Sequence, residues 1–126
     1  LTDLGHATEL VIERVRNCQT LLLEANHDLA LLQSNSRRPW SVKQRILSRH
    51  GHLSNEGAAG LVRRVIHENL SHLFLGHLSA DCNTPALALG AIGAVIDELG
   101  FRDRIHLSAA SQDRPTERVV VGSAAT

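Results

Sequence analysis

The chain has 126 residues, with 13 basic and 13 acidic side chains, a formal net charge of zero and 43% hydrophobic residues. This balance excludes a disordered charged tail, which has too few core-forming residues to fold, and predicts one domain with an aliphatic core. No apolar run approaches the roughly 18 residues that span a bilayer, so we expect no membrane partner. Cys18 and Cys82 stand alone, which favours a reducing, cytoplasmic location over a disulfide framework.

Helix-like and strand-like segments alternate along the chain. Capping residues and apolar periodicity predict, in chain order, a helix over 8–17, a strand over 20–24, helices over 28–33, 40–50 and 54–66, a strand over 73–75, a helix over 84–99, and strands over 104–107 and 118–121. The clearest signal is Thr84-Pro85, a capping residue followed by a first-turn proline, ahead of a long apolar face that Gly100 ends. This alternation is typical of the α/β fold class, and no linker or repeat divides the chain.

Eight histidines are present, and several stand where predicted strands end. His77 directly follows one apolar strand and His27 lies just beyond another, at the carboxyl ends where α/β proteins build their sites. His52 lies in a glycine-containing turn before a helix, and Asp3 lies in a short turn before the first helix. Zinc and manganese take imidazole and carboxylate ligands from several loops, so these four side chains are a candidate metal site. The alternative is that the histidines are exposed loop residues or partners of other polar groups.

A second feature is a basic stretch, residues 29–55, that contains no acidic residue. Its cationic side chains are Arg37, Arg38, Lys43, Arg45 and Arg49. Such a stretch beside a metal site favours contact with a phosphate backbone, and Trp40 within it offers a ring that stacks on a base. The nucleic-acid-binding candidates are therefore Arg38, Trp40, Lys43 and Arg45. The alternative is a solvated helix face on which Trp40 is a buried anchor.

Six short motifs, taken in their order along the chain, point to one family. They are Thr2-Asp-Leu-Gly5, Leu22-Leu-Glu-Ala-Asn-His-Asp28, Pro39-Trp-Ser-Val-Lys-Gln-Arg-Ile46, His50-Gly-His-Leu-Ser-Asn-Glu56, Gly76-His-Leu-Ser79 and Asn83-Thr-Pro85. Their order and spacing resemble the metallo-β-lactamase-fold phosphodiesterases, and in particular the YycJ/WalJ-like group of bacterial metal-dependent hydrolases. That group is regarded as double-strand DNA exonucleases. The resemblance covers nearly the whole chain, since it ends with the segment Ser111-Gln-Asp-Arg-Pro115.

The resemblance implies a role for individual residues. Asp3 matches the aspartate that bridges two metal ions in this superfamily, and His77 matches its last metal-ligating histidine. His52 resembles the histidine that ribonuclease Z relatives place beside the scissile phosphate, where it is thought to protonate the leaving oxygen. Asn26 and His27 match a motif of the group that lies near the site. The resemblance therefore implies two divalent metal ions, zinc or manganese, and a nucleic acid substrate, with DNA favoured.

One part of the family pattern is absent from the sequence: the HxHxDH metal motif and the single-histidine ligand that follows it. In the family these precede the position of Asp3. We therefore expect residues 1–126 to be the C-terminal half of a metallo-β-lactamase αββα sandwich, and to be inactive without the N-terminal half. The absence of methionine fits this expectation. Two alternatives are a hydrolase of the same fold acting on a small ester, thioester or lactone, and a non-enzymatic half-domain that folds only with a partner.

Overall fold

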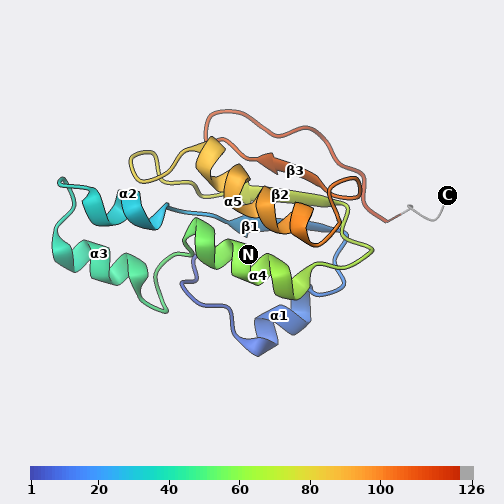
Figure 1. Cartoon of the computed structure of the whole chain (residues 1–126), viewed down its shortest axis with the longest axis horizontal. Helices are drawn as coiled ribbons and strands as arrows, with labels where there is room; N and C mark the ends of the chain where they lie inside the picture. Colours follow the sequence, from blue (N-terminus) through green and yellow to red (C-terminus); the bar gives the residue numbers. More distant parts are fainter. Residues whose placement is uncertain (123–126) are drawn as a thin grey trace.

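The computed structural model of the protein describes residues 1–122 (Figure 1). Its elements, in chain order, are α1 (Glu9–Val15), β1 (Thr20–Glu24), α2 (Leu29–Ser34), α3 (Trp40–Leu47), α4 (Asn55–Val65), β2 (His72–Gly76), α5 (Pro85–Glu98) and β3 (His106–Ala109). The strands form one parallel sheet in the order β1-β2-β3, in which Leu22 lies opposite Phe74 and Phe74 opposite Ser108. The predicted α/β fold class is confirmed.

Helices α4 and α5 cover one face of the sheet, with α1 beside α4 (Figure 1). Alternate strand residues are buried against these helices: Leu21, Leu23, Leu73 and Leu75. The apolar stripes of the two long helices supply the other side of this core: Ala58, Leu61, Val62, Val65, Ala88, Ile92, Val95 and Ile96. Burial of apolar surface contributes roughly 25 cal/mol per Å². This aliphatic core is therefore the main interaction that holds the strand ends, and the side chains that follow them, in place.

Helices α2 and α3 extend beyond the end of the sheet and form a smaller cluster of their own (Figure 1). Leu32 of α2, Ile46 of α3 and Cys82 pack together there. Asp28 caps α2, since its carboxylate accepts the Leu31 N–H at 2.9 Å. This packing places the basic stretch at the carboxyl ends of β1 and β2.

The end of α3 differs from the prediction, because the helix stops at Leu47 and not at His50. The Ser48 N–H and hydroxyl both donate to the carbonyl of Arg45, and the His52 N–H donates to the carbonyl of Ile46 at 3.0 Å. The chain therefore folds back onto the helix that it has just left. Gly51 makes this possible, since a Cβ at this position would lie 2.1 Å from the Ile46 oxygen.

The segment after β3 also differs from the prediction. β3 begins two residues later than expected, and residues 118–121 do not form a strand. Side chains attach this segment to the sheet instead: Glu117 pairs with His106, and the Gly122 N–H donates to Oε1 of Gln19. Gln19 precedes β1, which lies at the opposite edge of the sheet from β3. The segment therefore crosses the sheet from one edge to the other and does not add a fourth strand. Among residues 1–122, no helix combines the length and hydropathy that a bilayer crossing requires.

Candidate functional site

Four potential metal ligands meet at the carboxyl end of the sheet. Glu24 is the last residue of β1, and His77 directly follows β2, its parallel neighbour. Asp3 comes from the N-terminal turn and His52 from the turn between α3 and α4. Each residue offers one ligand atom, and these atoms all lie within 4.8 Å of one another. We call Asp3, Glu24, His52 and His77 the four-residue cluster.

Glu24 is the buried centre of this cluster, with a side chain that is 0% exposed. Its Oε1 accepts hydrogen bonds from Nδ1 of His52, at 2.9 Å, and from Nδ1 of His77, while its Oε2 accepts the Leu53 N–H at 3.0 Å. Burial alone would raise the pKa of Glu24, but the hydrogen bonds from His77, Leu53 and His52 outweigh it and lower that pKa below its ordinary value. The carboxylate is therefore charged at neutral pH.

The two histidines share this carboxylate and lie edge to face. Their ring centroids are 4.9 Å apart with an interplanar angle of 71°. Because an ionised carboxylate only accepts hydrogen bonds, we assign the proton of each ring to Nδ1, which leaves Nε2 of His52 and His77 free to bind or to exchange a proton. Oδ1 of Asp3 lies 3.7 Å from Nδ1 of His52 and 3.8 Å from Nδ1 of His77. A carboxylate that orients an imidazole through a hydrogen bond from Nδ1, as Glu24 does here, is typical of metal-binding histidines.

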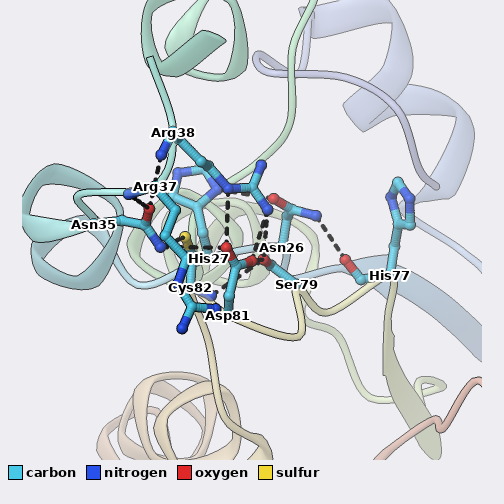
Figure 2. A network of polar contacts seen from close by, with 9 residues as sticks. All are labelled: Asn26, His27, Asn35, Arg37, Arg38, His77, Ser79, Asp81 and Cys82. Carbon is cyan, nitrogen blue, oxygen red and sulfur yellow. Dashed lines mark hydrogen bonds and ion pairs between the residues drawn. The ribbon is translucent and has the colours of Figure 1, made fainter. Parts of the chain in front are cut away.

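Asp3 and His77 have an unusual backbone conformation. They are the two non-glycine residues with positive φ within residues 1–122, at 60° and 58°. This left-handed region is sparsely populated and, where the surroundings impose it, is often part of a functional site. At His77 it is held by Asn26, whose Nδ2 donates to the His77 carbonyl at 2.8 Å (Figure 2). Near Asp3, the Gly5 N–H donates to the carbonyl of Arg49 at 3.1 Å, which fixes the N-terminal turn against the turn after α3.

A network of polar contacts joins the start of α3 to the loop after β2 (Figure 2). Arg38 donates to both carboxylate oxygens of Asp81, at 2.7 and 3.2 Å, and to Oγ of Ser79 at 3.4 Å. Asn35 accepts the N–H groups of Arg37 and Arg38 and donates to Asp81. The Arg38 guanidinium and the Ser79 hydroxyl hold the pKa of the Asp81 carboxyl well below its usual range. The network fixes the loop that follows His77 relative to the basic stretch.

The structure does not bring His27 together with Asp3, His52 and His77, and Glu24 lies among them instead. His27 is only 1% exposed, its Nδ1 lies 3.1 Å from Oδ1 of Asn26, and its Nε2 has no hydrogen-bond partner among the described residues. Burial lowers the pKa of His27 below its ordinary value, so the ring is neutral at pH 7. The chain turns this ring into the interior, away from the site surface. Asn26, in contrast, lines a cavity beside His52.

The structure divides the basic stretch into buried and exposed parts. Lys43 is buried and its Nζ donates to the carbonyl of Gln33 at 3.0 Å, so it holds α3 against α2 and reaches no phosphate. Trp40 is 66% exposed, which excludes its being a buried anchor. Arg38 is paired with Asp81, whereas Arg45 is exposed. Arg38, Trp40 and Arg45 are thus accessible from the surface, and Lys43 is not.

Comparisons with known proteins give this geometry a context. The chain is 38% identical over 101 residues to exodeoxyribonuclease YycJ of Bacillus anthracis, an alignment that covers 80% of the chain and 38% of that protein. It is 43% identical over 88 residues to exodeoxyribonuclease WalJ of Streptococcus pneumoniae, covering 70% of the chain and 32% of that protein. No protein-family model and no solved structure matches. The chain is homologous to the YycJ/WalJ exodeoxyribonucleases.

The chain spans about a third of the length of YycJ and WalJ. This homology confirms the resemblance carried by the six sequence motifs. Within residues 1–122, a parallel three-stranded sheet and five helices are consistent with part of the fold of these relatives. Among residues 1–122 of this YycJ/WalJ homologue, the four-residue cluster is the group of side chains that could hold a metal ion.

Glu24 is the member of the site that sequence reasoning missed. The signal was present in the segment Thr20–Glu24, where a carboxylate ends an apolar strand and is followed by Ala25, which is fully buried. In the sequence this glutamate looks the same as a polar residue that merely ends an apolar strand. A buried carboxylate requires several hydrogen-bond donors, and two of the histidines expected at the same end of the sheet are such donors.

Proposed function

We propose that this chain carries part of the active site of a metal-dependent phosphodiesterase, an exonuclease that acts on DNA. The observation that carries the proposal is the convergence of Asp3, His52 and His77 on the buried Glu24, in a chain homologous to exodeoxyribonucleases. In this proposal residues 1–126 correspond to the C-terminal portion of a metallo-β-lactamase domain. The remaining metal ligands would come from the length that the relatives have and this chain does not span.

Asp3 and His77 are the proposed ligands, for two divalent ions of zinc or manganese. The donor set fits such ions, because Asp3 offers a carboxylate oxygen and His77 offers Nε2 of its imidazole. Glu24 orients the His77 ring through the contact with Nδ1. Divalent ions, when bound, stabilise charge on a phosphate and lower the pKa of water. The left-handed backbone at Asp3 and His77 supports the assignment, since such strained conformations cluster at functional sites, where the surrounding structure holds them.

His52 is the proposed general acid. Glu24 accepts the hydrogen bond from Nδ1 of His52 at 2.9 Å, which fixes the orientation of the ring and leaves Nε2 free to carry a proton. The proton on Nε2 is then the one that His52 would give to the leaving oxygen of the phosphodiester. Arg38 and Arg45 line the cavity beside this ring and offer phosphate contacts, and exposed Trp40 offers a stacking surface, which together support a nucleic acid strand near the site. The two free thiols, Cys18 and Cys82, support a cytoplasmic location.

The test uses the full-length protein with linear duplex DNA, and a small ester, a thioester and a lactone as alternative substrates. We expect metal-dependent release of nucleotides from DNA and no turnover of the small substrates. His77→Ala should lower metal occupancy, whereas His52→Ala should retain metal and lose roughly 100-fold or more of the activity. Turnover of the small substrates without digestion of DNA would overturn the phosphodiesterase proposal. Full activity in His52→Ala would overturn the acid role alone.

A further inference from the structure

A cavity of about 240 Å³ adjoins the four-residue cluster and shares His52 with it. The polar side chains of its lining are Asn26, Arg38, Arg45, His50 and His52. We call this cavity the Arg45 pocket. Two guanidinium groups and two imidazoles face it, and no carboxylate belongs to its lining. The pocket is therefore positively charged, and its volume is that of a small group rather than of a drug-sized ligand, which takes about 300–1,000 Å³.

Two neighbouring cavities differ from the Arg45 pocket in charge. One of about 390 Å³, on the His77 side of the cluster, includes Asp113 in its lining and neither arginine nor lysine. Another, of about 490 Å³, combines Arg49 with Asp3. Of these three cavities, the Arg45 pocket is the one that presents cationic side chains without a carboxylate. An anion that approaches the cluster is therefore attracted most strongly to this side of it.

The two arginines of the pocket differ in their partners. Arg38 is held by Asp81 through two contacts, at 2.7 and 3.2 Å, so its charge is compensated and its position fixed. Arg45 lies in the last turn of α3, is exposed, and makes no ion pair within residues 1–122. No acidic residue occurs between positions 29 and 55 to compensate its charge. A guanidinium without a partner in a cavity wall is a donor suited to bidentate contact with phosphate.

We propose that the Arg45 pocket binds a phosphate group of a nucleic acid strand, next to the phosphate that reacts at the four-residue cluster. Arg45 is the principal donor, His50 is the second contact, and Arg38 forms a fixed wall. His52 belongs to both the pocket and the cluster, so one side chain adjoins both phosphate positions of the same strand. The inference rests on the proposed function. The phosphate group is either an internal diester or a terminal monoester, which share this chemistry.

The test measures binding without catalysis, in the full-length protein with its metal removed by EDTA. The probes are thymidylyl-thymidine, which has one internal diester, and thymidine monophosphate, which has one terminal monoester. Arg45→Met should weaken binding of the tighter probe about tenfold. It should also reduce the slope of log K for duplex DNA against log salt concentration by about one. Methionine is a good helix former, and thermal unfolding checks that the variant is folded.

The matched control is Arg37→Met, in which an exposed arginine of the same basic stretch, outside the pocket, loses its charge. It should weaken binding of the same probe less than about twofold. Equal losses in the two variants would overturn the proposal, as would failure of both probes to bind the wild type at millimolar concentration. Tighter binding of the diester supports an internal phosphate, and tighter binding of the monoester supports a strand end.

The outcome for the pocket is distinguishable from the outcome for the proposed function. A wild type that binds the probes as expected but, with metal restored, digests no DNA would contradict the proposed function and leave the Arg45 pocket supported. A metal-loaded wild type that digests DNA, together with equal behaviour of Arg45→Met and Arg37→Met in the binding test, would overturn the pocket and leave the proposed function intact.

Discussion

The side-chain amide of Asn26 lies 2.8 Å from the backbone carbonyl of His77, a residue 51 positions later in the chain. The same asparagine donates its backbone N–H to the carbonyl of Leu53 and accepts the N–H of Ser79. It therefore joins the turn after β1, the turn before α4 and the loop after β2. These segments contain or directly follow three members of the four-residue cluster, Glu24, His52 and His77, although Asn26 itself is not a member.

We expect Asn26→Ala to weaken metal binding by the full-length protein roughly 10- to 100-fold, the range typical of groups that orient a metal ligand. The physical reason is that the left-handed backbone at His77 loses the hydrogen bond that holds it. Isothermal titration with Zn²⁺ measures this effect. Asn69→Ala, at an exposed position, is the control and should leave the affinity unchanged. Equal affinities in the two variants would show that Asn26 does not position His77.

Glu24→Gln should lower the free energy of unfolding by about 2 kcal/mol or more, because a buried carboxylate that accepts four N–H donors becomes a neutral amide with N–H groups of its own. Urea denaturation of the metal-free protein measures the change. Glu13→Gln, on the exposed side of α1, should change this free energy by less than about 0.5 kcal/mol. A Glu24→Gln variant as stable as Glu13→Gln would contradict the role of Glu24 as the buried centre of the cluster.

The starts of the helices were predictable because they depend on neighbours in the sequence. Thr8, Asp28, Ser54 and Thr84 each accept the backbone N–H three residues on, as the capping rule requires. The end of α3 was not predictable in this way. It depends on how the chain after Ser48 returns to the carbonyl of Ile46, a contact that apolar periodicity does not encode.

The candidate site was likewise predictable in part, with some of its residues evident from the sequence and others not. Strand ends and turns placed Asp3, His52 and His77 at one end of the sheet, because parallel strands bring their carboxyl ends together. Glu24 and His27 could not be distinguished from the sequence, since both follow the apolar part of β1 and only the packed structure decides which one faces the histidines. Burial of Lys43 likewise depends on the contact between α2 and α3.

His27 should make the stability of the protein depend on pH. Burial lowers its pKa in the folded state below the ordinary 6.5, so the unfolded chain binds a proton that the folded chain does not. The contribution of His27 is therefore fully present at neutral pH and is lost as the pH falls below about 6.5. Urea midpoints at pH 7 and pH 5.5 should differ less in His27→Gln than in the wild type. His6→Gln, at an exposed position, should retain the wild-type difference, and the same difference in His27→Gln would contradict the assignment.

Gly51→Ala should lower the free energy of unfolding by about 2 kcal/mol, because its Cβ would lie 2.1 Å from the Ile46 oxygen and 2.4 Å from the Arg45 oxygen. The displaced turn carries His52, so activity of the full-length protein should fall as well. Gly60→Ala is the matched control, since this helical position in α4 has open space around it. This substitution should raise the free energy of unfolding by about 0.5–1 kcal/mol. Thermal unfolding separates the two. An unchanged melting temperature in Gly51→Ala would show that this close approach does not occur.

Glu24 is bonded to partners 21, 28 and 53 positions away, at Asp3, His52 and His77. Within residues 1–122, no hairpin or single helix brings any two of these groups together, so each contact closes a long loop at a cost in chain entropy. During refolding the cluster should form late, together with the parallel pairing of β1 and β2 and after the helices. A ligand that binds only the assembled cluster then opposes global unfolding in proportion to the logarithm of its concentration, and has little effect on fraying of a single helix.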